Sequence, residues 1–132
     1  LRGRLAQLAQ PAELWLDGGH NPAAGEAIAA TLRRWPARPT HLVAGMLNTK
    51  DVAGFLRPLA AAADRLWAVS IPGERNTLPA EETAAQAAAA GLPAEVAAGV
   101  EAAVRAAVAA GAGRVLVCGS LYLAGHVLRD WE

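Results

Sequence analysis

Short runs of apolar residues alternate along the chain with longer stretches in which apolar residues recur at every third or fourth position. Short apolar runs bounded by turn residues are typical of buried strands, and the wider spacing is typical of helices with one buried face. The alternation predicts an α/β fold with a mostly parallel sheet covered by helices on both faces. The expected strands, about six in number, are residues 5–8, 14–17, 41–45, 65–71, 94–97 and 114–118.

Helical patterns follow each of the last five expected strands. The clearest carries Ile28, Leu32 and Trp35 on one face and ends before Pro36, because proline cannot continue a helix. The expected helices are residues 22–35, 51–59, 79–90, 99–110 and a last helix after Ser120, with Ala124, Val127, Leu128 and Trp131 on one face.

The first two expected strands, 5–8 and 14–17, are separated by a short segment that contains Gln10-Pro11. A parallel connection needs a long crossover, whereas a tight turn joins antiparallel strands. We therefore expect the first strand to be antiparallel to the second.

Composition and charge exclude several classes of protein. Hydrophobic residues make up 54% of the 132 residues, which excludes a disordered chain and predicts a single domain over 1–132. The formal net charge is zero, so neither nucleic acid nor a membrane surface is an expected partner. The sequence shows neither a membrane span nor a signal peptide. The single cysteine, Cys118, excludes an internal disulfide, and we expect a buried thiol in a reducing, cytoplasmic compartment.

The stretch Asp17-Gly18-Gly19-His20-Asn21-Pro22 has the layout of a ligand-binding joint between a strand and a helix. In open α/β sheets, ligands bind at the carboxyl ends of the strands. Asn21 is a good helix N-cap and Pro22 fits the first helical position. The same residues also suit an ordinary turn, so these six residues alone leave both interpretations open.

Several catalytic motifs are missing from the sequence. Neither a Gly-x-x-x-x-Gly-Lys-Ser/Thr phosphate loop nor a Gly-x-Gly-x-x-Gly dinucleotide motif occurs. His20, His41 and His126 are too far apart in sequence to support a zinc site, and Ser120 lacks the second glycine of a hydrolase elbow.

Residues 17–22 are similar to an Asp-Gly-Ala-His-Asn-Pro motif, and residues 3–5 to a Pro-Gly-Arg-Leu segment. Residues 45–51 resemble Gly-Met-Leu-x-x-Lys-Asp, and residues 119–125 resemble Gly-Ser-Leu-Tyr-Leu-x-Gly. Taken in their order along the chain, the four segments resemble the C-terminal domain of the folylpolyglutamate synthase/dihydrofolate synthase family, in the Mur ligase superfamily. The departures are Gly19 for alanine, Arg2 for proline, and Asn48-Thr49 where an acidic residue often precedes the lysine.

The resemblance implies a Rossmann-like three-layer sandwich and an ATP-dependent ligase that adds L-glutamate to dihydropteroate or folate through an acyl phosphate. In the family, the phosphate loop and the Mg²⁺ ligands lie in an N-terminal ATPase domain, which these 132 residues lack. The chain begins at Leu1 rather than Met, so we expect a fragment that is inactive alone. ATP and Mg²⁺ are the implied cofactors, and we expect no metal ligands in this chain.

The resemblance also implies roles for five side chains, which we expect to gather at one rim of the sheet. Arg4 and Asp17 are expected to bind ATP, Asp17 through ribose hydroxyls. His20 and Lys50 are the expected catalytic residues, and His20 and Ser120 are expected to hold glutamate. Each has a structural alternative: a solvated cation for Arg4 and Lys50, a turn cap for Asp17, a surface histidine for His20, and an N-cap for Ser120.

Other polar residues are assigned structural roles. We expect Asp51 to be the N-cap of its helix, and His41 and His126 to be structural or surface residues. Arg75 is only a weak candidate for substrate contact.

Two other functions remain open at this point. The chain is alternatively a free-standing module that binds a nucleotide or an amino acid without chemistry, or the C-terminal domain of a peptidoglycan Mur ligase. Substrate preference, polyglutamate chain length and oligomeric state are not determined by the sequence.

Overall fold

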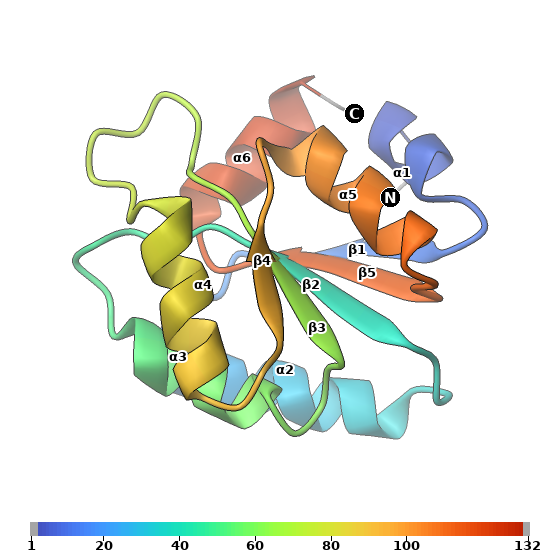
Figure 1. Cartoon of the computed structure of the whole chain (residues 1–132), viewed down its shortest axis with the longest axis horizontal. Coiled ribbons are helices and arrows are strands. Elements are labelled where there is room, and N and C mark those ends of the chain that lie inside the picture. Colours follow the sequence, from blue (N-terminus) through green and yellow to red (C-terminus); the bar gives the residue numbers. More distant parts are fainter. Residues whose placement is uncertain (1–2, 131–132) are drawn as a thin grey trace.

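The computed structural model describes residues 3–130, which form five strands and six helices (Figure 1). The elements are α1 (Arg4–Ala9), β1 (Glu13–Leu16), α2 (Pro22–Arg34), β2 (Thr40–Ala44), α3 (Val52–Leu59), β3 (Arg65–Ala68), α4 (Ala80–Ala89), β4 (Ala94–Val96), α5 (Val100–Ala109), β5 (Arg114–Cys118) and α6 (Leu121–Asp130).

The strands form one sheet in the order β1-β5-β2-β3-β4, and every pairing is parallel. The last strand in sequence therefore lies between the first two. Because all strands run in the same direction, their carboxyl ends meet at one edge, which is where the loops after β1, β2 and β5 come together.

Helices cover both faces of the sheet, as predicted (Figure 1). Alternate residues of each strand point to opposite faces, and they enter two separate apolar clusters. One cluster joins Val43, Val115 and Val117 to α1, α5 and α6. The other joins Leu42, Leu116 and helices α2, α3 and α4. The three-layer sandwich expected from the resemblance is therefore confirmed.

The prediction for residues 5–8 was wrong. They belong to helix α1, so the sheet described by the structure has five strands rather than six and its first strand is not antiparallel. Leu5 and Ala9 are four residues apart and both are buried against the α5 side of the core. This spacing fits one face of a helix, and the segment was too short for its period to be recognised.

The other predicted elements agree with the structure, with changes at their ends. The strand expected over 65–71 ends at Ala68, and the expected strand 94–97 is the short β4. In α6, Val127 is buried but Leu128 is 52% exposed, so Leu128 does not share the buried face. Trp131 lies outside the described residues.

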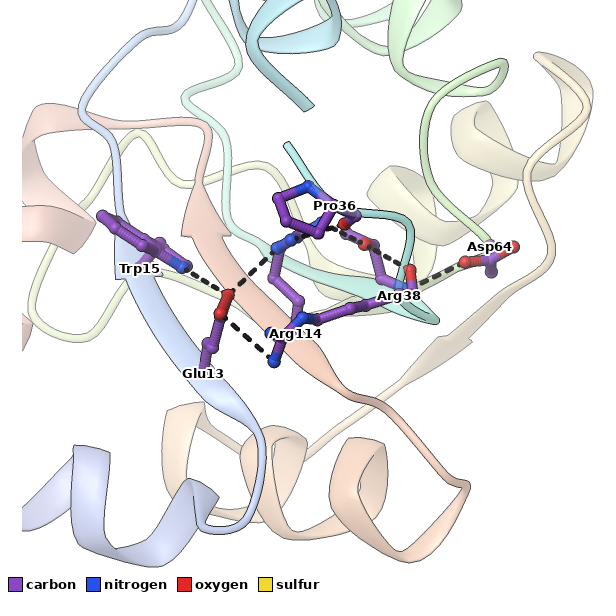
Figure 2. Close-up of polar contacts among 7 residues, drawn as sticks. Glu13, Trp15, Pro36, Arg38, Asp64 and Arg114 are labelled. Atoms are coloured by element: carbon purple, nitrogen blue, oxygen red, sulfur yellow. Dashed lines mark hydrogen bonds and ion pairs between the residues drawn. The ribbon is translucent and has the colours of Figure 1, made fainter. Parts of the chain in front are cut away.

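The amino end of the sheet is closed by a polar network around Arg114, the first residue of β5 (Figure 2). Its guanidinium donates to Glu13 Oε2 at 3.3 Å, to the Pro36 carbonyl at 2.9 Å and to Thr40 Oγ1 at 3.4 Å. It also lies 5.2 Å from the centre of the Trp35 ring. Arg114 thus joins the starts of β1, β2 and β5 to the end of α2.

Candidate functional site at the carboxyl edge of the sheet

Three loops meet at the carboxyl edge of the sheet, after β1, β2 and β5. The Gly45 amide donates to the Cys118 carbonyl at 3.3 Å, which joins the second loop to the third. Gly119 has a φ of +106°, and a Cβ there would lie 2.6 Å from Met46 Sδ and 2.7 Å from the Gly45 carbonyl oxygen. Only glycine fits this approach, because it has no Cβ and adopts positive φ freely.

A hollow of about 240 Å³ lies among these loops. It brings together three of the five predicted site residues: His20 from the loop after β1, Lys50 from the loop after β2, and Ser120 from the loop after β5. Its full lining is His20, Leu47, Lys50, Gly119, Ser120, Leu121 and Tyr122.

His20 lies immediately before the N-terminus of α2. Asn21 caps that helix through a 2.8 Å bond from the Ala24 amide to its Oδ1, and Pro22 occupies the first turn, both as predicted. The Nδ1 atom of His20 is buried and has no hydrogen-bond partner among the described residues. Buried polar atoms are normally paired, and Arg65 Nε and Thr83 Oγ1 lack a partner in the same way, so it is the place of His20 in the lining of the hollow that relates it to a ligand.

Ser120 is 2% exposed and is the N-cap of α6. Its Oγ accepts hydrogen bonds from the Tyr122 amide at 3.0 Å and the Leu123 amide at 3.4 Å. The structural alternative for Ser120 is therefore confirmed. It does not exclude a binding role, because a hydroxyl that accepts two bonds still has one hydrogen to donate.

Lys50 follows a tight turn and is half-buried at the wall of the hollow. Its amide donates to the Leu47 carbonyl at 3.3 Å. The next residue, Asp51, is the N-cap of α3, as predicted, and its Oδ1 accepts from the Gly54 amide at 2.9 Å. The turn and the cap fix the backbone on both sides of the lysine.

Asp17 lies outside this hollow. Its Oδ1 accepts from the Gly19 amide at 2.7 Å, so its predicted turn-capping role is confirmed. The residue lies at the end of a separate groove of about 300 Å³ between β1 and α2. The groove is lined by Trp15, Leu16, Asp17, Ala24, Ala27, Ile28, Thr31, Leu32, Trp35 and Leu116.

Arg4 is exposed at the first residue of α1 and belongs to the lining of neither the hollow nor the groove. The structure thus brings three of the five predicted residues, His20, Lys50 and Ser120, into one hollow. Asp17 lies in the neighbouring groove, and Arg4 lies on α1, which covers the other face of the sheet from α2.

Cys118 and His41 are structural, as predicted. Burial, together with the negative charge of Asp17, raises the pKa of the Cys118 thiol to about 12, so the thiol stays protonated. His41 is buried, and its Nδ1 accepts a hydrogen bond from Trp67 Nε1 at 3.1 Å. His126 is half-buried on α6, and Arg75 is exposed in the loop after β3.

Sequence reasoning gave no role to Leu47, Leu121 and Tyr122, which also line the hollow. All three lie inside the segments that carry the resemblance, and their place there is the signal by which the sequence could have indicated them.

Within residues 3–130 no group of three or more histidine, cysteine, aspartate or glutamate side chains is arranged to hold a metal ion. None of the described helices is both long enough and apolar enough to cross a bilayer.

Comparison with known proteins places this geometry in a family. Residues 2–121 match the family described as "Mur ligase, glutamate ligase domain". The folylpolyglutamate synthase of Lacticaseibacillus casei is 30% identical over 76 residues, which cover 58% of this chain and 18% of that protein.

Two solved structures have the same fold over most of the chain. Mycobacterium tuberculosis folylpolyglutamate synthase complexed with ADP has a TM-score of 0.82 and 25% identity, over 92% of this chain and 30% of that one. A bifunctional folylpolyglutamate synthase/dihydrofolate synthase with Mn, AMPPNP and L-glutamate bound has a TM-score of 0.74 and 29% identity, over 89% and 28%.

The chain therefore spans less than a third of the length of each of these relatives. The family match, in contrast, covers nearly the whole chain and includes residues that line the hollow. The chain belongs to the Mur ligase, glutamate ligase domain family.

Proposed function

We propose that this chain is the C-terminal domain of an ATP-dependent ligase that joins L-glutamate to dihydropteroate or folate. The observation that carries the proposal is the hollow that unites His20, Lys50 and Ser120 at the carboxyl edge of the sheet. The likeness to folylpolyglutamate synthases, one of them with L-glutamate bound, supports the choice of amino acid.

The proposed reaction needs an activated carboxylate, because oxide is a poor leaving group. Transfer of the γ-phosphoryl group of ATP to the carboxylate gives an acyl phosphate and ADP. The amino group of glutamate then attacks the acyl carbon, the amide forms, and inorganic phosphate leaves. Enzymes promote such steps mainly by positioning the reactants and by stabilising the charge on the phosphoryl group.

The residues of the hollow suit these two tasks. Lys50 supplies a positive charge for the acyl phosphate. His20 lines the hollow and is the proposed contact for the glutamate or the reacting phosphate. Ser120 offers its hydroxyl hydrogen at the start of α6, where the positive end of the helix dipole favours a carboxylate. These three residues are the proposed contacts for L-glutamate and for the phosphoryl group.

Asp17 and Arg4 are the proposed contacts for ATP. Only one carboxylate oxygen of Asp17 is used in the bond to Gly19, so the other is available for ribose hydroxyls. Arg4 would contact phosphates from α1. When bound, Mg²⁺ would neutralise phosphate charge, and its ligands are proposed to lie in the ATPase domain of a longer cytoplasmic protein.

The proposal is tested by expressing the longer open reading frame and measuring ADP release that depends on L-glutamate and dihydropteroate or a folate. We expect ligation by the longer protein and none by residues 1–132 alone. His20→Ala and Lys50→Met should each lower kcat/KM on the order of a hundredfold while leaving the unfolding midpoint nearly unchanged. Ligation by the 132 residues alone would refute the proposal, as would a start codon immediately before Leu1, which would favour a free-standing binding module.

A further inference from the structure

The loop that carries Lys50 is held in place by a second loop. Residues 69–79 connect β3 to α4 and form the long excursion at the upper left of Figure 1. On their return they pair with residues 46–48. The contacts are a 2.7 Å bond from the Leu78 amide to the Met46 carbonyl, a 2.8 Å bond from the Asn48 amide to the Asn76 carbonyl, and an antiparallel bridge between Leu47 and Thr77.

Thr77 closes this second loop through its side chain. Its Oγ1 accepts a hydrogen bond from the Ile71 amide at 2.8 Å and donates one to the Leu78 carbonyl at 3.2 Å. Ile71 is at the start of the excursion, so one hydroxyl ties the start to the end. The Thr77 amide adds a bond to the Glu74 carbonyl at 3.3 Å.

The pairing extends from Thr77 to the hollow. Leu47, the bridge partner of Thr77, lines the hollow, and its carbonyl accepts the hydrogen bond from the Lys50 amide. The backbone position of Lys50 relative to His20 and Ser120 therefore depends on the segment that the Thr77 hydroxyl fixes.

We propose that Thr77 is a positioning residue for Lys50 in the ligation reaction. This inference rests on the function proposed above. Thr77 itself is not among the residues that line the hollow, so it acts through the backbone of residues 46–48. Small displacements of a reacting group are costly, since a shift of about 1 Å can lower a rate on the order of a hundredfold.

Thr77→Val in the longer ligase provides the test, because valine has nearly the shape of threonine without the hydroxyl. We expect about a tenfold loss in kcat/KM for L-glutamate, because the Lys50 backbone should move by less than the roughly 1 Å that lowers a rate a hundredfold. Thr77→Ser retains the hydroxyl and should restore most of the activity. Thr77→Ala removes it without the bulk of valine, and serves if the valine variant does not fold.

Thr83→Val is the matched control. Thr83 is fully buried on α4, and its Oγ1 has no hydrogen-bond partner among the described residues. Removing this hydroxyl should leave kcat/KM unchanged. A loss as large as that of Thr77→Val would mean that any threonine hydroxyl in this region has the same effect, and would overturn the inference.

A double-mutant cycle with Lys50→Met separates positioning from general stability. If Thr77 acts through Lys50, the double variant should be no less active than Lys50→Met alone. Losses that multiply would overturn the inference and leave the proposed function intact. A parent enzyme without glutamate ligation, or a fully active Lys50→Met variant, would contradict the proposed function and the inference together.

Discussion

At the amino end of the sheet, the guanidinium of Arg114 is bonded to Glu13, Thr40 and the Pro36 carbonyl, whereas at the carboxyl end His20 Nδ1 is buried with no partner in the described part of the chain. Both ends are built from polar residues at strand ends. In the first, the hydrogen bonds of Arg114 are made within the protein and hold strands together, although Arg65 Nε at the start of β3 is buried without a partner among the described residues. In the second, His20 lines a hollow at the edge where ligands bind in open α/β sheets, and this is the basis of its proposed contact with a ligand.

The amino-end network extends beyond Arg114. Glu13 also accepts from Trp15 Nε1 at 3.2 Å and pairs with Arg38 at 3.3 Å. The bond to Trp15 is the largest cause of a lowered pKa for the Glu13 carboxyl. Burial opposes the shift, and smaller contributions from Arg114 and Arg38 add to the effect of Trp15. Asp64 accepts from the Thr40 amide at 2.8 Å, which connects the start of β2 to the residue before β3 (Figure 2).

The largest effect on stability should come from Arg114→Met. The change leaves the buried Thr40 hydroxyl and the Pro36 carbonyl without their donor and removes a buried cation from the start of β5, and we expect a loss of about 3 kcal/mol in the free energy of unfolding. Urea denaturation measures it. Arg105→Met removes only an exposed pair with Glu101 and should cost less than about 0.5 kcal/mol. Equal costs for the two variants would mean that the amino-end network is not a stabilising feature.

At the carboxyl end, Gly119→Ala tests the close contact of two loops. We expect a loss of roughly 2 kcal/mol, because the new Cβ meets both positive φ and the atoms of Gly45 and Met46. Gly111 has a φ of +95°, and a Cβ added there would meet nothing within 4 Å, so Gly111→Ala isolates the cost of φ alone. Calorimetry of both variants should show a larger loss of unfolding free energy for Gly119→Ala. A larger loss for Gly111→Ala would mean that the contact of the new Cβ with Gly45 and Met46 costs nothing.

Ser120→Ala should cost about 1 kcal/mol through loss of the N-cap of α6. Ser70→Ala is the control, since Ser70 Oγ accepts from the Ala80 amide at 3.2 Å, at the start of α4 and away from the hollow. We expect both variants to lower the unfolding midpoint, and only Ser120→Ala to raise the KM for L-glutamate in the longer ligase. An unchanged KM would limit Ser120 to its capping role.

The smallest effect should be a pH dependence at the amino end. Burial, with a further contribution from Arg65, lowers the pKa of His41 below its ordinary value of 6.5, although Asp64 opposes the shift. The folded state therefore disfavours the protonated form. Its contribution to stability is complete above the ordinary pKa and is lost as the pH falls through that value toward the folded one.

His41→Gln removes this titration. The difference in unfolding free energy between the parent chain and the variant should narrow as the pH falls below about 6.5. Chemical denaturation of both proteins at several pH values measures this difference. The contributions of the other titrating groups cancel because the two proteins share them. A difference that does not vary with pH would contradict the assignment to His41.

Local signals in the sequence predicted most of the elements and several of their ends. The caps at Asn21 and Asp51 were predicted because a capping side chain bonds to an amide only a few residues away. Residues 5–8 were misassigned because a helix of six residues, fewer than two turns, is too short to show its period. The burial of Leu5 and Ala9 against α5, which decides the outcome, involves residues far away in sequence.

The candidate site was predicted only in part. The sequence predicted that Arg4, Asp17, His20, Lys50 and Ser120 gather at one rim of the sheet, and the structure brings His20, Lys50 and Ser120 into one hollow without Arg4 and Asp17. It did not predict that Asp17, three residues before His20, faces a different groove, or that Thr77 supports the Lys50 loop. Each depends on how separate loops pack against one another.

By itself, the sequence determined the α/β alternation, the caps and the residue types at the strand ends, because these follow from periodicity and from bonds between near neighbours. Only the tertiary structure decided that β5 lies between β1 and β2, and which buried polar atoms of the described residues are paired and which are not. The physical reason is that strand order and loop contacts are set by burial of residues distant in sequence, which no local pattern records.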